Sequence, residues 1–188
     1  MELQIAGLPL HILLVHVVVV GVPLLAVVLV VLSAWPAARR ALWLVTLIAA
    51  LVLLGLTYLT IESGEWLEDR VAETPLTEQH TGQGEDILPW MIALTVVAAL
   101  VAALAIVERR ERRGRTDAEV AANRGITSTV ARRSPARSAI AVLLIVAAVG
   151  VGIGSVWTMV LIGDSGARAV WQGSFSDQPS GEGEGGDD

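Results

Sequence analysis

Four long apolar runs dominate this 188-residue sequence and constrain its fold more than any other feature. Each approaches or exceeds the roughly 20 residues that a helix needs to cross the hydrocarbon of a bilayer. The chain is 54% hydrophobic, which is too apolar for a soluble domain of this size. We therefore predict an all-α integral membrane protein, a four-helix transmembrane bundle in contact with lipid, with one domain over residues 1–172. The spans fall at roughly 8–33, 41–61, 87–107 and 139–162.

Arginine is distributed unevenly among the connections between these spans. Eleven of the 13 basic residues lie in the connections 34–40 and 108–138. Because basic residues in short connections stay cytoplasmic, both connections are predicted inside and both termini outside. Arginine without lysine, beside abundant alanine, valine and glycine, is typical of a GC-rich bacterial genome, which predicts a multi-pass protein of the bacterial plasma membrane. The net charge of −6 comes mostly from acids on the predicted outer side and does not indicate a nucleic-acid partner.

Residues typical of helix starts and helix ends predict where helices begin and end on the outer side. Thr74-Pro75 reads as an N-cap followed by proline at the first helical position, so a helix carrying His80 begins there and enters lipid near Ile87. Glu62-Ser63-Gly64 and Asp164-Ser165-Gly166 read as the ends of spans 2 and 4, with Gly64 in the left-handed position after the helix. The run at 173–188 is acidic and glycine-rich and is predicted to be disordered.

Two pairs of similar span ends hint at an internal duplication. Spans 1 and 3 both open on Leu-Pro, at 8–9 and 88–89, and spans 2 and 4 both close on an acid followed by Ser-Gly. Such a duplication predicts two parallel hairpin repeats related by an axis along the membrane normal. The alternative is that helix ends favour proline and Ser-Gly anyway.

Two histidines in the first span are candidate ligands. His16 lies about 10 Å into the helix, within the outer leaflet, and an ionisable residue at such depth is a functional hypothesis by default. The alternative is a neutral imidazole hydrogen-bonded to a neighbouring helix. His11 projects about 140° away from His16 at 100° per residue, so the two cannot hold one ion from one face. We expect each to look toward a different neighbour.

Acids at the predicted outer ends of the helices extend this candidate site. Glu62 and Asp164 would sit at the negative end of a helix dipole, where an anion usually has a partner. The metal ligands predicted from this grouping are His11, His80, Glu62, Glu65 and Asp164. They offer the nitrogen and oxygen atoms that a divalent metal uses. The alternative is a solvated acidic rim with ordinary salt bridges.

The absence of cysteine excludes disulfides, thiolate metal sites, iron–sulfur clusters and covalently attached haem. No catalytic triad, phosphate loop or nucleotide fingerprint is present, so no catalytic residue is predicted.

The opening Gly7–His16, with two histidines five residues apart, resembles the start of a bacterial membrane family known as domain of unknown function 2231. The His80 region and the closing stretch Gly163–Trp171 look like its actinobacterial branch, and the likeness covers about 5–171. The resemblance implies a four-helix membrane domain. Some relatives are joined to Rieske-type or c-type cytochrome domains, which implies work near a redox or haem centre.

The leading functional hypothesis is a redox-associated membrane domain in which His11, His16 and His80 bind haem b or a divalent metal near the outer leaflet, beside a redox partner protein at the outer face. The alternative is a non-catalytic membrane subunit that docks a partner. The oligomeric state stays open.

The predicted topology can be tested by labelling intact cells. Cysteine introduced at Ser180 should react with an impermeant maleimide, whereas cysteine introduced at Ser134 should be protected until the membrane is opened, because Ser134 lies in the arginine-rich connection. Reversed labelling would overturn the orientation.

Overall fold

The computed structural model describes residues 3–122 and 135–174, which are almost entirely helical. Within them α1, α2, α4 and α5 are long and apolar enough to cross a membrane, which confirms the predicted all-α four-helix bundle. A short antiparallel hairpin, β1 paired with β2, precedes the helices. The elements in chain order are β1 (Gln4–Ile5), β2 (Leu8–Pro9), α1 (Leu10–Ala34), α2 (Pro36–Glu68), α3 (Pro75–Gly84), α4 (Ile87–Ala122) and α5 (Pro135–Trp171).

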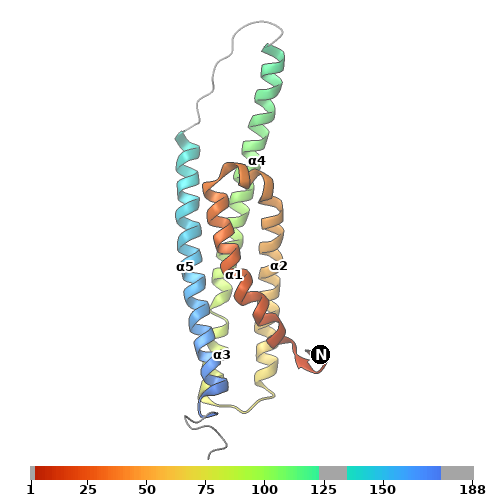
Figure 1. Cartoon of the computed structure of the whole chain (residues 1–188), viewed down its shortest axis with the longest axis vertical. Coiled ribbons are helices and arrows are strands. Elements are labelled where there is room, and N and C mark those ends of the chain that lie inside the picture. Colours follow the sequence, from red (N-terminus) through yellow and green to blue (C-terminus); the bar gives the residue numbers. More distant parts are fainter. Residues whose placement is uncertain (1–2, 123–134, 175–188) are drawn as a thin grey trace, which may run out of the picture.

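The helices are arranged as two hairpins that run side by side in the same direction (Figure 1). α1 packs against both α2 and α5, and α4 packs against the same two helices. α1 and α4 face each other across the centre, while α2 and α5 lie on opposite sides. This is the arrangement that two parallel hairpin repeats require.

The inward faces of α1 and α4 carry the core at matching positions. Arg39, early in α2, pairs with Glu108 of α4, and the two are 69 residues apart. The same separation relates the buried residues of the two central helices, so a pseudo-twofold axis runs between them. The buried residues are Val18, Val22, Leu25, Leu29 and Leu32 on α1, and Ile87, Met91, Leu94, Ala98 and Val101 on α4.

Small residues let neighbouring helices approach closely, as is common where lipid replaces water. A Cβ added to Gly21 of α1 would lie 2.8 Å from a Leu53 methyl of α2. A Cβ added to Gly154 of α5 would lie only 2.1 Å from the Trp90 ring of α4. The outward faces are apolar as well: Leu143 is 68% and Val20 66% exposed. A surface of this kind is suited to contact with lipid chains.

Two helices run further than the sequence predicts. α2 continues past Gly64 to Glu68, and α5 continues past Gly166 to Trp171. Neither glycine has positive φ, so the prediction of a left-handed Gly64 is wrong. Glu62 and Asp164 therefore lie inside helices, and the argument from their place at a helix end fails. Glycine is tolerated within a helix at a cost of about 1 kcal/mol, and here both glycines make room for histidine rings.

The predicted start of the third helix is confirmed. The Thr74 hydroxyl accepts a hydrogen bond from the Thr77 amide at 3.2 Å, while the Thr77 hydroxyl accepts from the Thr74 amide at 2.9 Å. This reciprocal cap begins α3 at Pro75. α3 ends at Gly84, before the apolar run that begins with Ile87. It is a separate short helix that carries His80 ahead of the span.

The arginine-rich connection predicted at 108–138 is helical up to Ala122 and again from Pro135. Residues 175–188, and with them nearly all of the predicted acidic tail, lie outside the described residues.

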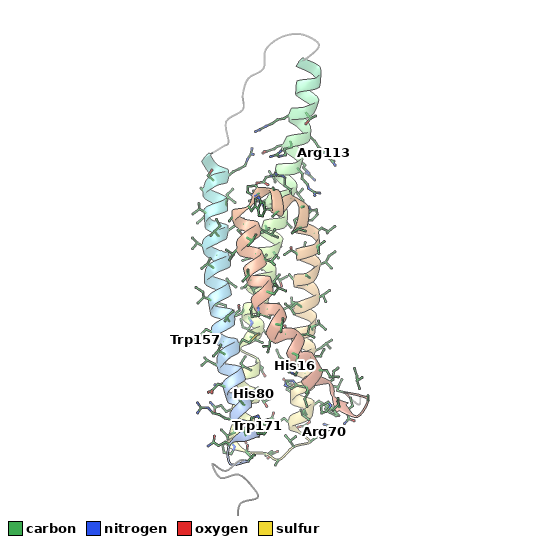
Figure 2. The ribbon with its side chains drawn as sticks, viewed as in Figure 1. His16, Arg70, His80, Arg113, Trp157 and Trp171 are labelled. Carbon is green, nitrogen blue, oxygen red and sulfur yellow. The ribbon has the colours of Figure 1, made fainter. Side chains whose placement is uncertain are left out.

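The two ends of the bundle differ in polar character. Figure 2 shows His80 and Trp171 near one end and Arg113 toward the other. We call the first, where α1 begins, the His end, and the second, where α1 passes into α2, the Arg end. At the Arg end the Arg39 guanidinium is only 2% exposed.

Arg39 joins three helices at the Arg end. Its Nη1 donates to the carbonyls of Leu32 and Ser33, both at 2.9 Å, near the end of α1. Its Nε and Nη2 donate to the two carboxylate oxygens of Glu108 on α4. A cation at a helix C-terminus also interacts favourably with the helix dipole. Arg39 thus satisfies carbonyls that α1 leaves unpaired and links both hairpins.

Breaking this pair from one side should destabilise the bundle strongly. Arg39→Leu leaves the Glu108 carboxylate, only 13% exposed, without its main partner, and loss of one member of a buried pair typically costs about 3–5 kcal/mol. The double variant Arg39→Leu/Glu108→Leu should unfold at a higher temperature in detergent than Arg39→Leu alone, because no largely buried carboxylate is left without its guanidinium partner. A double variant that shows the full sum of both single losses would contradict this coupling.

Candidate functional site

His11 is held at the His end by the beginning of α1 and the second half of α2. The hairpin before it turns through Gly7, which has φ +79°, and places His11 in the first turn of α1. Its Nδ1 lies 2.8 Å from the Thr60 carbonyl oxygen. Since a carbonyl only accepts, Nδ1 donates. The ring lies over Gly64, where an added Cβ would come within 3.0 Å of Nδ1.

His80 is held by α5 in a closely similar way. Its Nδ1 donates to the Ile162 carbonyl at 3.1 Å and lies 3.2 Å from the Ser165 hydroxyl. The ring lies over Gly166, where an added Cβ would come within 2.8 Å of Cε1. α3 supplies this histidine and α5 supplies the carbonyl, the hydroxyl and the glycine.

Each histidine therefore sits in a socket made of a carbonyl, a serine and a glycine in one short stretch of helix. In α2 the Ser63 hydroxyl donates to the Thr60 carbonyl at 3.0 Å, three residues earlier. In α5 the Ser165 hydroxyl donates to the Ile162 carbonyl at 2.9 Å, again three residues earlier. Both serines are buried. The two Ser-Gly pairs thus occupy corresponding positions in the two hairpins. They form the sockets for the histidine rings and do not end the helices.

The two histidines meet near the pseudo-twofold axis. Their ring centroids are 6.3 Å apart and the ring planes cross at 82°. Because each Nδ1–H is occupied by a carbonyl, a neutral ring keeps its free lone pair on Nε2. In the described part of the chain neither Nε2 makes a hydrogen bond. Two charged rings in such contact would repel each other, so the arrangement favours at least one neutral imidazole.

One polar atom on α3 has no hydrogen-bond partner among the described residues. Gln83 follows His80 by three residues on α3, which places the two on one side of the helix. Its Oε1 is buried and accepts no hydrogen bond from the described residues. Buried polar atoms are usually satisfied, and an orphan points to a water, an ion or a ligand.

His16 lies apart from this pair, as Figure 2 illustrates on α1. Its side chain is exposed on the outer surface of α1, and Nδ1 bonds to the Ile12 carbonyl of its own helix at 2.7 Å. The expectation that it looks toward a neighbouring helix is therefore wrong. The 140° angle between the two histidines of α1 turns His11 inward and leaves His16 facing outward.

The predicted acids do not join the histidines either. Glu62, Glu65 and Asp164 are exposed, and Asp164 pairs with Arg168 one turn away at 2.9 Å. Among the described side chains, those of residues 3–116 and 137–174, no three His, Asp or Glu groups are placed to hold a metal ion together. Of the five predicted metal ligands, the structure brings together only His11 and His80, because the acids lie on the outward sides of α2 and α5.

Sequence reasoning missed the sockets themselves. Ser63, Gly64, Ser165 and Gly166 were interpreted as helix ends, although their recurrence beside the two histidine-bearing segments was a usable signal. Gln83 carried no signal in the sequence.

The chain matches no family model, no curated protein and no solved structure. The resemblance to domain of unknown function 2231 stays a prediction.

The sockets can be tested by adding one methyl group. Gly166→Ala places a Cβ against the His80 ring and should displace it from its hydrogen bonds, with an overpacking cost of about 1–3 kcal/mol. Gly163→Ala, in the same helix with nothing within 4 Å of its added Cβ, is the matched control. We expect a clear drop in melting temperature and a shifted His80 ring signal in NMR for Gly166→Ala only. Equal behaviour of the two variants would refute a tight socket.

Proposed function

We propose that this chain is a membrane protein that binds a transition-metal centre at its His end through Nε2 of His11 and His80. The centre is either the iron of haem b or a single metal ion, since both use the same imidazole chemistry. The observation that carries the proposal is the contact between two imidazoles whose Nδ1–H groups are each bonded to a backbone carbonyl.

Histidine metal ligands almost always donate the other ring N–H to a carbonyl, a carboxylate or water, which fixes the tautomer and the ring orientation. The carbonyls of Thr60 and Ile162 occupy that role here. Both imidazoles are therefore oriented with the Nε2 lone pair available. The hydroxyls of Ser63 and Ser165 donate to the same two carbonyls and help to fix their positions.

The spacing of the rings suits a shared centre. With metal–nitrogen distances of about 2 Å, the centres of two imidazoles on opposite sides of one ion lie about 6 Å apart. The observed 6.3 Å between ring centroids agrees with this value. If a metal were bound there, His11 and His80 would each supply one imidazole nitrogen to hold it.

The orientation follows from the arginines. With the arginine-rich connections in the cytoplasm, the His end faces the outside of a bacterial plasma membrane. A centre there is accessible to a redox partner protein at the outer face, which agrees with the redox associations implied by the resemblance.

Substitution of each histidine by leucine distinguishes a histidine that binds the metal centre from one that only packs. Purified after expression with haem and metals supplied, the wild type should carry bound haem or near-stoichiometric metal. His11→Leu and His80→Leu should each lower that content about tenfold or more, because each removes a ligand. His16→Leu should retain it, since this exposed ring lies apart from the pair. The measurements are an absorption spectrum, in which a Soret band identifies haem, and metal analysis.

A wild type that carries neither haem nor metal, or a His80→Leu protein that keeps either in full, would end the proposal. The partner-docking role would then be the remaining hypothesis.

A further inference from the structure

The Arg end has a partly open cavity of about 380 Å³ between the start of α2, the middle of α4 and the start of α5. Its charged lining comes from segments far apart in the sequence. The cavity is well within the size range of small-ligand sites, which run from about 300 to 1,000 Å³. The charged residues that line it on α2 and α5 are Arg39, Arg40 and Arg137, and on α4 Glu108, Glu111, Arg112 and Arg115.

The charges of this cavity do not balance. Glu108 pairs with Arg39 and with Arg40, the latter at 3.5 Å, and Glu111 pairs with Arg137. Five arginines against two glutamates leave a surplus of positive charge around an open volume. Among the side chains that the structure describes, in residues 3–116 and 137–174, Arg112 and Arg115 have no salt-bridge partner.

Membrane topology alone does not account for this arrangement. Retention of a connection in the cytoplasm needs only an excess of basic residues near the span ends. It does not require guanidinium groups from three helices to converge on one cavity, nor two acids that fix three of them in place. The guanidinium groups of Arg112 and Arg115, which form no salt bridge with the described side chains, instead offer the planar, bidentate geometry that suits phosphate oxygens.

The depth of the cavity matches that of lipid headgroups. Glu108 follows the apolar run of α4, whose last buried members are Leu104 and Ala105, and it lines the cavity directly. Basic pockets between transmembrane helices at this level are suited to anionic headgroups. Ser138 and Thr116 also line the cavity.

We propose that the cavity at the Arg end binds a phosphate-bearing anion, either the headgroup of an anionic phospholipid or a soluble phosphate. The anion neutralises Arg112 and Arg115, and it joins α4 to the start of α5 across the space between them. This site lies at the opposite end of the bundle from His11 and His80 and does not depend on the function proposed for them.

The test compares two double variants of equal charge. Arg112→Gln/Arg115→Gln removes two lining cations, whereas Arg110→Gln/Arg113→Gln removes two exposed cations of the same helix that do not line the cavity. All four side chains are exposed, so both proteins should fold. Binding of phosphatidylglycerol, with phosphatidylcholine as the neutral comparison, is counted by native mass spectrometry from detergent. Thermal stabilisation by inorganic phosphate is measured in parallel.

The wild type and the Arg110/Arg113 variant should bind phosphatidylglycerol, or be stabilised by phosphate, to the same degree. The Arg112/Arg115 variant should bind at least tenfold more weakly. A response to the lipid identifies a headgroup site, and a response to phosphate alone identifies a soluble anion. If both double variants bound the lipid or phosphate equally weakly, net surface charge would explain the binding and the proposal would be overturned. A wild type that responds to neither probe would also overturn it.

Discussion

A hydrocarbon environment offers no hydrogen-bond partner to a buried imidazole or guanidinium, so polar side chains in a membrane bundle must find partners within the protein. The two polar clusters here follow from that constraint. At the Arg end, Arg39 donates hydrogen bonds to two carbonyls at the end of α1 and to both carboxylate oxygens of Glu108. At the His end, His11 and His80 each donate a hydrogen bond to a backbone carbonyl of a neighbouring helix. The apolar core of α1 and α4 lies between these two attachments.

The parallel arrangement of the two hairpins about a pseudo-twofold axis explains why both clusters lie near that axis. Near a twofold axis, a residue meets its own counterpart. At the His end the counterparts are identical, and two neutral imidazoles can share a contact or a ligand. At the Arg end the counterparts are Arg39 and Glu108, which are opposite in charge. Two arginines at that distance would repel each other, whereas Arg39 and Glu108 form an ion pair.

The two hairpins also differ in how their helices pack. In the first hairpin a glycine of α1, Gly21, accepts Leu53 from α2, while in the second a glycine of α5, Gly154, accepts Trp90 from α4. The large and small partners have changed helices, yet each hairpin keeps one close approach. The histidine sockets kept the same chemistry in both hairpins, which is consistent with a function for the His end beyond packing.

The sequence by itself determined the class of fold, because hydropathy over four long runs leaves few other structures, and it located the start of α3 through the cap at Thr74. It also indicated that His11 and His16 diverge, because the helical angle is fixed. Which of the two faces inward was decided only by the tertiary structure. α1 is apolar on every side, so no periodicity marks its inward face. A second ambiguity concerns the Ser-Gly pairs, which the sequence alone predicts to be helix ends. A glycine that stops a helix and a glycine that makes room for a neighbouring ring look alike until the neighbour is in place.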